Sequence, residues 1–163
     1  MLKLVHPYLP ILVHCHFPFT KENEYIQRLI SLLEEYLMSE AEISESLGSL
    51  YKYAQQLDKA EEYYRQALSL APENPFYLNN LAFVLIDSET NIEEGLELVD
   101  QALDSIPDHY VILDTKGWGL YKQGKYTEAL EILEKCWELK PIYNHLIYTH
   151  LEEVSNTLSK KQG

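Results

Sequence analysis

An internal repeat constrains the fold of this chain more than any other feature of its sequence. Each of three copies carries two small residues and then a proline at the same spacing, provided that the second copy is allowed one extra residue within 88–91. These positions are Gly48, Ala60 and Pro72, then Ala82, Gly95 and Pro107, then Gly117, Ala129 and Pro141. The copies follow one another without linkers, so the sequence predicts a stack of equivalent units.

Each copy is predicted to be a helical hairpin, because its small residues allow two helix backbones to approach closely. In the third copy we expect a polar turn at 122–125 and a second helix over 127–139, since Pro141 cannot continue a helix. The first helix of the second copy has an apolar stripe at helical spacing, formed by Leu78, Leu81, Ala82 and Leu85.

This pattern resembles that of the tetratricopeptide repeat family, whose repeats have small residues and a proline at these positions. The resemblance covers 41–143 and implies an all-α, right-handed α-solenoid of helix-turn-helix repeats. Ser44 and Lys116 depart from the family pattern, in which an aromatic and an apolar residue are usual. The run 79–139 is similar to a group of bacterial tetratricopeptide proteins that share the phrase Leu-Asp-Thr-x-Gly-Trp, here Leu113 to Trp118.

The predicted organisation has five segments. The repeats occupy 41–74, 75–109 and 110–143, and residues 144–163 form a capping helix and tail. Residues 1–40 hold an N-terminal segment and an amphipathic helix at 22–37, which together are read as a degenerate repeat. The capping helix has an apolar face at Ile147, Leu151, Val154 and Leu158, and the helix at 22–37 turns Ile26, Leu29, Ile30 and Leu33 inward.

Composition excludes several classes of partner. Acidic residues outnumber basic ones by 26 to 13, and a formal charge of −13 repels phosphate backbones and anionic membranes.

The apolar stretch 2–19 is interrupted by three prolines and has no cleavage site, so neither a signal peptide nor membrane insertion is predicted. The compartment stays undetermined: the cytoplasm is favoured for a soluble protein, and the bacterial periplasm is the alternative.

No residue pattern predicts catalysis, and no cofactor is expected. The segment His14-Cys15-His16 has no second ligand pair at zinc spacing, so no metal site is predicted. His145 and His150 are expected at the surface or an edge. Adjacent carboxylates such as Glu61 and Glu62 point to different sides of a helix and are interpreted as solvated surface.

The resemblance implies that the first helices of the repeats line a concave groove that binds a peptide segment of a partner protein. The predicted peptide-binding residues combine aromatic rings, amides and one lysine: Tyr53, Phe76, Asn79, Asn80, Phe83, Trp118, Tyr121 and Lys122. An acidic rim of Glu42, Glu45, Asp87 and Asp114 surrounds them. The expected ligand is therefore a neutral or basic peptide with a bulky apolar residue.

Other functions stay open at this stage. The capping helix or the N-terminal segment could cover the groove, the array could serve self-association into a homo-oligomer, or the chain could be a regulatory or assembly fragment of a larger enzyme or envelope complex. Binding of acidic chaperone tails is not expected, because only one of the five residues of the family's two-carboxylate clamp is present. The clamp positions here hold Glu45, Ser49, Asn80, Val111 and Thr115, of which Asn80 alone matches.

Overall fold

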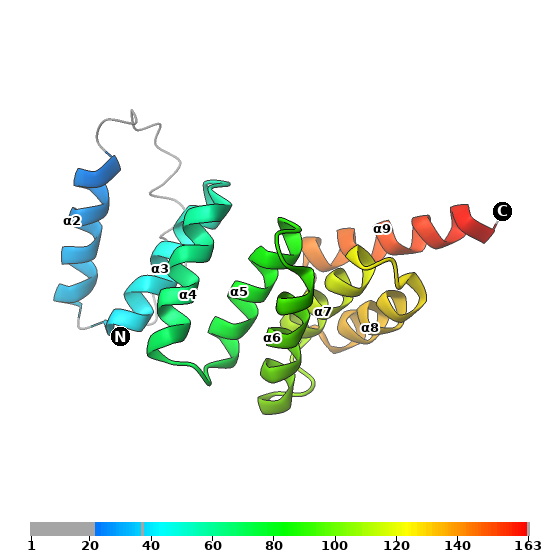
Figure 1. The fold of residues 1–163 in the computed structure, drawn as a ribbon. Coiled ribbons are helices and arrows are strands. Elements are labelled where there is room, and N and C mark those ends of the chain that lie inside the picture. The colour runs from blue at the N-terminus through cyan, green and yellow to red at the C-terminus, as the bar shows by residue number, and fades with distance from the viewer. Residues whose placement is uncertain (1–21, 37, 163) are drawn as a thin grey trace. The chain divides into compact units, whose positions relative to one another are not determined.

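The computed structural model describes residues 22–36 and 38–162, and every regular element in these ranges is an α-helix (Figure 1). The helices are α2 (Glu22–Glu35), α3 (Glu40–Tyr53), α4 (Leu57–Leu70), α5 (Pro75–Asp87), α6 (Ile92–Ser105), α7 (Tyr110–Lys122), α8 (Tyr126–Leu139) and α9 (His145–Gln162). The all-α prediction is confirmed. The cluster His14-Cys15-His16 lies outside the described residues. In the described ranges no helix has the length and apolar character needed to cross a membrane.

The helices belong to two compact units, residues 1–71 and 72–163. In the first unit, α3 and α4 pair through the glycine that the repeat pattern singled out. A Cβ atom on Gly48 would lie 2.6 Å from Cδ1 of Tyr64, and the ring of Tyr64 is fully buried. Its hydroxyl lies 3.0 Å from the Ser49 hydroxyl, and burial raises the pKa of Tyr64. The Tyr64 ring of α4 therefore fits against α3 because Gly48 has no side chain at the point of contact.

Helix α2 also belongs to the first unit, where it contacts α3. Three of its four predicted inward residues are buried, namely Ile26, Leu29 and Leu33, whereas Ile30 is half-buried. Helix α3 starts with a capping box: Ser39 accepts a hydrogen bond from the backbone N–H of Glu42, and the Glu42 carboxylate accepts one from the backbone N–H of Ser39.

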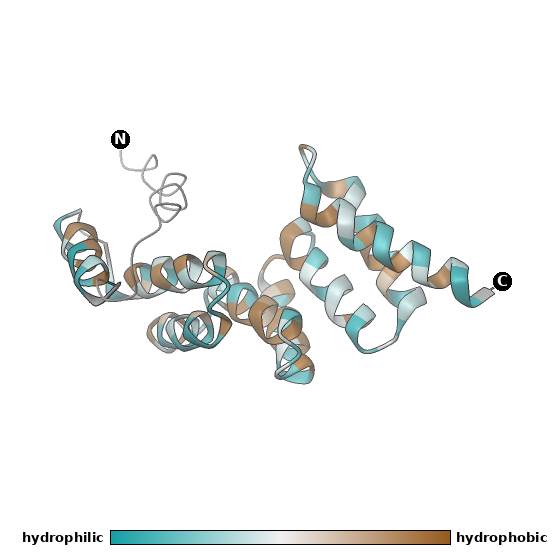
Figure 2. Cartoon of the chain, turned by 90° about the horizontal axis from the view of Figure 1, so that it is seen from above, coloured by the Kyte–Doolittle hydropathy of each residue, from teal (hydrophilic) through white to brown (hydrophobic). Residues whose placement is uncertain are grey.

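In the second unit, α5 pairs with α6 and α7 pairs with α8, and the predicted small residues lie at both helix crossings. A Cβ atom on Gly95 would lie 2.6 Å from Cγ1 of Ile86, and one on Gly117 would lie 2.5 Å from Cγ of Leu133. The close approach of the paired helices is thus confirmed. Figure 2 shows both hydrophobic and hydrophilic residues on these helices, as packing on one side requires.

The second unit has an inner and an outer layer. Helix α5 contacts α7, and α7 contacts α9, whereas α6 and α8 share no comparable contact. Because successive first helices are closer together than successive second helices, α5, α7 and α9 form the inner face of this unit. Helix α9 packs on α8 through Ile147 and Val154, which join two core clusters with residues of α7 and α8. It therefore holds the place of a first helix in a further repeat.

Candidate functional site

Helix α5 gives the inner face of the second unit its most exposed aromatic ring. Asn74 caps the helix by accepting a hydrogen bond from the backbone N–H of Phe76 at 3.0 Å, and Pro75 occupies the first turn. Phe76 is 52% exposed. Its ring meets that of His109 edge to face at 5.4 Å, and His109 stacks on Tyr110 at 5.3 Å. The exposed ring is therefore held in place from one side by its neighbours.

One helical turn further, α5 buries a polar group that has no partner. Asn79 is 5% exposed, and its Oδ1 atom is fully buried without a hydrogen bond to any residue that the structure describes, as is the Nδ1 atom of His109. A buried acceptor without a donor costs about 1–3 kcal/mol in desolvation. Asn80 and Phe83, next on the same helix, are half-buried. Of the predicted peptide-binding residues, four thus lie together on α5.

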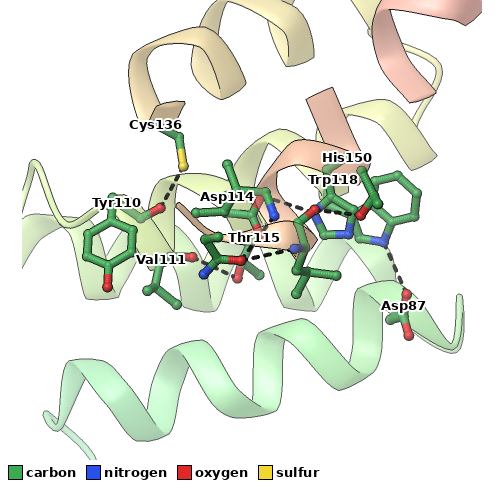
Figure 3. Close-up of polar contacts among 12 residues, drawn as sticks. Asp87, Tyr110, Val111, Asp114, Thr115, Trp118, Cys136 and His150 are labelled. Carbon is green, nitrogen blue, oxygen red and sulfur yellow. Dashed lines mark hydrogen bonds and ion pairs between the residues drawn. The ribbon is translucent and has the colours of Figure 1, made fainter. Parts of the chain in front are cut away.

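On α7, the predicted anchor Trp118 is already in contact with other parts of the second unit (Figure 3). Its ring stacks on His150 of α9 at a centroid distance of 4.2 Å and on Tyr121 at 5.0 Å. Its indole Nε1–H donates a hydrogen bond to Asp87 Oδ1 at 3.2 Å. Trp118 therefore connects α9, α7 and the end of α5.

The sequence predictions for Asp114 and His150 are wrong. Asp114 is 3% exposed rather than part of an acidic rim, and His150 is 5% exposed rather than at the surface. Nδ1 of His150 lies 2.9 Å from Oδ1 of Asp114, so the two polar side chains satisfy each other (Figure 3). The spacing of His150 from Ile147 and Val154 places it on the apolar stripe of α9, and this signal could have revealed its burial.

Tyr121 and Lys122 also have partners within the second unit. The Tyr121 hydroxyl donates to Glu153 at 3.0 Å, and the Lys122 ammonium lies 2.5 Å from a carboxylate oxygen of Glu89. The same ammonium lies 5.1 Å from the centroid of the Trp118 ring. In the third hairpin, α9 thus contacts the predicted anchors Trp118 and Tyr121, both of which are half-buried.

The remaining predicted residues are in the first unit or in its turns. Tyr53 ends α3, and its side chain is 49% exposed. Glu42 belongs to the capping box, where hydrogen bonds from the Ser39 side chain and backbone lower the pKa of its carboxyl group. Glu45 accepts a hydrogen bond from the Ser49 hydroxyl at 3.0 Å. Two of the four expected rim acids therefore have local structural partners, Ser39 just before α3 and Ser49 within it.

The described residues contain neither a candidate metal site nor an activated cysteine. No group of three His, Cys, Asp or Glu side chains in 22–36 and 38–162 could hold a metal ion. Cys136 is buried and donates to the backbone oxygen of Tyr110 at 3.0 Å, and burial together with the charge of Asp114 raises the pKa of its thiol to about 12. A thiol with so high a pKa is not a nucleophile at neutral pH.

Comparisons with known proteins agree with this geometry. Two models described as tetratricopeptide repeat match residues 41–74 and 112–140. A TPR repeat-containing protein of Pseudomonas aeruginosa, PA4667, is 34% identical over 97 residues, which are 60% of this chain and 16% of that protein. This chain therefore spans about one sixth of the length of that relative.

Solved structures of tetratricopeptide domains have a similar fold. The Sgt2 TPR domain of Aspergillus fumigatus has a TM-score of 0.67 at 25% identity, and the match covers 77% of this chain and 83% of that one. The TPR2B domain of yeast Sti1, in complex with an Hsp70 peptide, has 0.62 at 20% identity over 72% and 98%. The second TPR domain of human RPAP3, in complex with the HSP70 peptide SGPTIEEVD, has 0.60 at 20% identity over 71% and 95%.

Proposed function

Since this chain is a tetratricopeptide repeat protein that resembles bacterial members of the family, and hence a protein-interaction module, we propose that it is an adaptor or scaffold that binds a peptide segment of a partner on the inner face of its second unit. The proposed site is the α5 part of that face. Phe76 is its exposed anchor, and Asn79 and Asn80 are its amides. Trp118 and Tyr121 support the site from α7 instead of touching the ligand.

The observation that carries this proposal is the pairing of an exposed ring with an unsatisfied amide on one turn of α5. Side chains three apart on a helix share a face, so Phe76 and Asn79 are neighbours. A peptide that places an apolar side chain on Phe76 brings backbone N–H groups to the same turn. One of these can supply the donor that Asn79 Oδ1 lacks, once the atoms that cover this oxygen move aside. Binding would then remove an unfavourable feature of the free protein.

Charge favours a neutral or basic ligand. The net charge of the chain is −13, and Asp87 at the end of α5 is exposed. The peptide SGPTIEEVD bound by one of the similar solved domains is acidic, and the clamp positions here hold Glu45 and Val111 rather than cations. Titration of this chain with SGPTIEEVD by calorimetry should give no binding in the micromolar range, because like charges oppose association.

The experiment is affinity capture from a cell lysate by the full chain and its variants, followed by mass spectrometry. Phe76→Ala and Asn80→Ala should lose the partner that the parent captures, while circular dichroism shows that both variants stay folded. The matched control is Tyr36→Ala, which removes a ring with the same 52% exposure on the segment after α2. If Phe76→Ala and Asn80→Ala retain the partner as well as Tyr36→Ala does, the inner face of the second unit is not the recognition site. A chain that captures only itself, as shown by light scattering, would instead favour self-association.

A further inference from the structure

A second surface of the molecule has the composition of an interface and takes no part in the proposed peptide site. Where α8 turns into α9, four rings come together: Trp137 of α8, Tyr143 of the connection, and His145 and Tyr148 of α9. Their centroids lie 6.0 Å apart for Trp137 and Tyr148, 6.1 Å for Trp137 and Tyr143, and 6.3 Å for Tyr143 and Tyr148. His145 lies 6.4 Å from each of the two tyrosines. We call these four residues the aromatic corner.

Three of the four rings of the aromatic corner are exposed, and exposed apolar residues lie next to them in the sequence. Tyr143 is 63% exposed and Tyr148 38%, and the neighbouring Ile142 is 75% and Leu146 47% exposed. The core at this end of the unit is formed by other residues, Leu113, Cys136 and Ile147, against which only Trp137 of the four rings packs. The exposed rings are therefore not part of this core, and a cluster of exposed aromatic side chains on a folded domain is a candidate interaction site.

The aromatic corner already holds a cation. The ammonium of Lys140, at the end of α8, lies 3.3 Å from the centroid of the Trp137 ring and donates a hydrogen bond to the Trp137 backbone oxygen at 2.9 Å. A second feature favours positive charge: the Tyr148 hydroxyl donates to Glu152 at 3.2 Å, which places a carboxylate at the edge of the rings. Ring faces and a carboxylate both attract ammonium and guanidinium groups.

We propose that the aromatic corner is a second docking surface, which binds a basic and partly aliphatic segment of a partner protein. An arginine or lysine of that segment takes the face of Trp137 that Lys140 occupies in the free protein, and aliphatic side chains of the segment cover Ile142 and Leu146. Charge complementarity selects this occupant. A second copy of the chain would bring another −13 charge to the interface, and phosphate-bearing partners are repelled in the same way.

Lys140 makes the proposal testable, because it is a competitor within the chain. Lys140→Ala frees the ring, and it also removes one positive charge from the surface. The matched control is Lys135→Ala on the same helix, which removes an equal charge from a side chain that is 51% exposed and paired with Asp108. A gain in affinity for a basic peptide that exceeds the gain in Lys135→Ala is therefore due to the freed ring.

The probes are the capped peptides LRIRL and LQIQL, titrated into the ¹⁵N-labelled full chain and followed by NMR. We expect LRIRL, and not LQIQL, to shift the amide signals of residues 137–148 in a saturable way. Lys140→Ala should tighten binding about threefold more than Lys135→Ala does. Tyr143→Ala should weaken it about fivefold, with Tyr36→Ala unchanged. Ile142→Ser, at the most exposed apolar position, should also weaken the binding of LRIRL. Because Ile142 is exposed, this substitution should affect folding little.

Four results would overturn the proposal. The first is equal binding of LRIRL and LQIQL. The second is equal affinity of Tyr143→Ala and Tyr36→Ala at unchanged melting temperature. The third is a peptide-free dimer in sedimentation that Tyr143→Ala converts to a monomer, which would identify a second copy as the occupant. Shifts confined to α5 and α7 would also overturn it, while leaving the proposed peptide site on the inner face supported.

Discussion

The second and third hairpins place a buried polar side chain at the same position of their first helix, with opposite results. Asn79 of α5 and Asp114 of α7 are 5% and 3% exposed. Asp114 is paired with His150 of the next inner helix, whereas Oδ1 of Asn79 has no hydrogen-bond partner within 22–36 and 38–162. Counted along the repeats, Lys116 of α7 holds the place of His150, but its ammonium lies 2.7 Å from Asp100 of α6. The Asp114–His150 pair connects α7 to α9. No equivalent pair connects α5 to α7 at Asn79.

This difference distinguishes a structural end of the inner face from the proposed binding end. A satisfied buried pair fixes α9 on α7 and supports Trp118 through the His150 ring. The unsatisfied amide oxygen of Asn79 slightly destabilises the free protein. A hydrogen bond from a ligand N–H group to this oxygen would remove that cost. We therefore propose that the same repeat pattern serves stability in the third hairpin and recognition in the second, and several of the following predictions test this division.

The largest effect is expected for His150→Ala. It leaves the Asp114 carboxylate buried without its partner and removes the ring stacked on Trp118, so it should destabilise the protein by about 3 kcal/mol. Urea unfolding followed by circular dichroism measures this loss. His145→Ala, an exposed histidine of the same helix, should change the unfolding midpoint little. Equal midpoints for the two variants would show that the pair does not hold α9.

A close second is expected at the helix crossings, which the two hairpins share. A leucine at Gly117 would overlap Leu133, and one at Gly95 would overlap Ile86. Gly117→Leu and Gly95→Leu should each destabilise by about 2 kcal/mol or more through overpacking. Thermal melts test both variants side by side. An unchanged melt for Gly117→Leu contradicts the close approach of α7 and α8.

The two aromatic side chains of the inner face should respond differently to truncation. Trp118→Ala removes a ring with four partners and should lower the free energy of unfolding by about 2 kcal/mol. Phe76→Ala should leave stability nearly unchanged and instead weaken the captured peptide by about 2 kcal/mol. Calorimetry and melting of both variants separate the two roles. Loss of binding in Trp118→Ala with an intact melt would return Trp118 to the ligand site.

Asn79→Leu should have a smaller effect of opposite sign. The apolar side chain has a similar volume and removes the unpaired acceptor, so stability should stay the same or rise by up to about 1 kcal/mol. Peptide affinity should fall at the same time, because the acceptor for the peptide N–H is gone. A stabilised variant that binds peptide as tightly as the parent would show that Asn79 has no part in recognition.

The smallest effect concerns an exposed carboxylate, in contrast to the buried Asp114. Hydrogen bonds from Ser39 lower the pKa of Glu42 from its ordinary value of 4.5, so the folded state favours the charged form. The resulting stabilisation is present above pH 4.5 and is lost as the pH falls below this value. For so exposed a group it should amount to less than about 1 kcal/mol. Melts between pH 3 and 6 should show a smaller loss on acidification in Glu42→Gln than in the parent, and identical pH profiles would contradict the capping role.

The repeat pattern alone determined the fold class and the positions of the hairpins. Spacing of small residues is a local and periodic signal, so Gly48, Gly95 and Gly117 could be placed at helix crossings without coordinates. The predicted second helix of the third hairpin, 127–139, begins one residue late, and the capping helix expected within 144–163 is observed at His145–Gln162. Such errors are ordinary at helix termini, where hydrogen bonding changes gradually.

Only the tertiary structure decided which polar and aromatic side chains meet. Asp114 and His150 are 36 positions apart, and nothing in either helix alone indicates that one satisfies the other. The aromatic corner likewise combines rings from α8, the connection and α9. A repeat fixes where a side chain points, because the helix period sets its direction. It does not fix which residue that side chain contacts. The partner comes from the next helix, at a position whose residue type the repeat pattern does not specify.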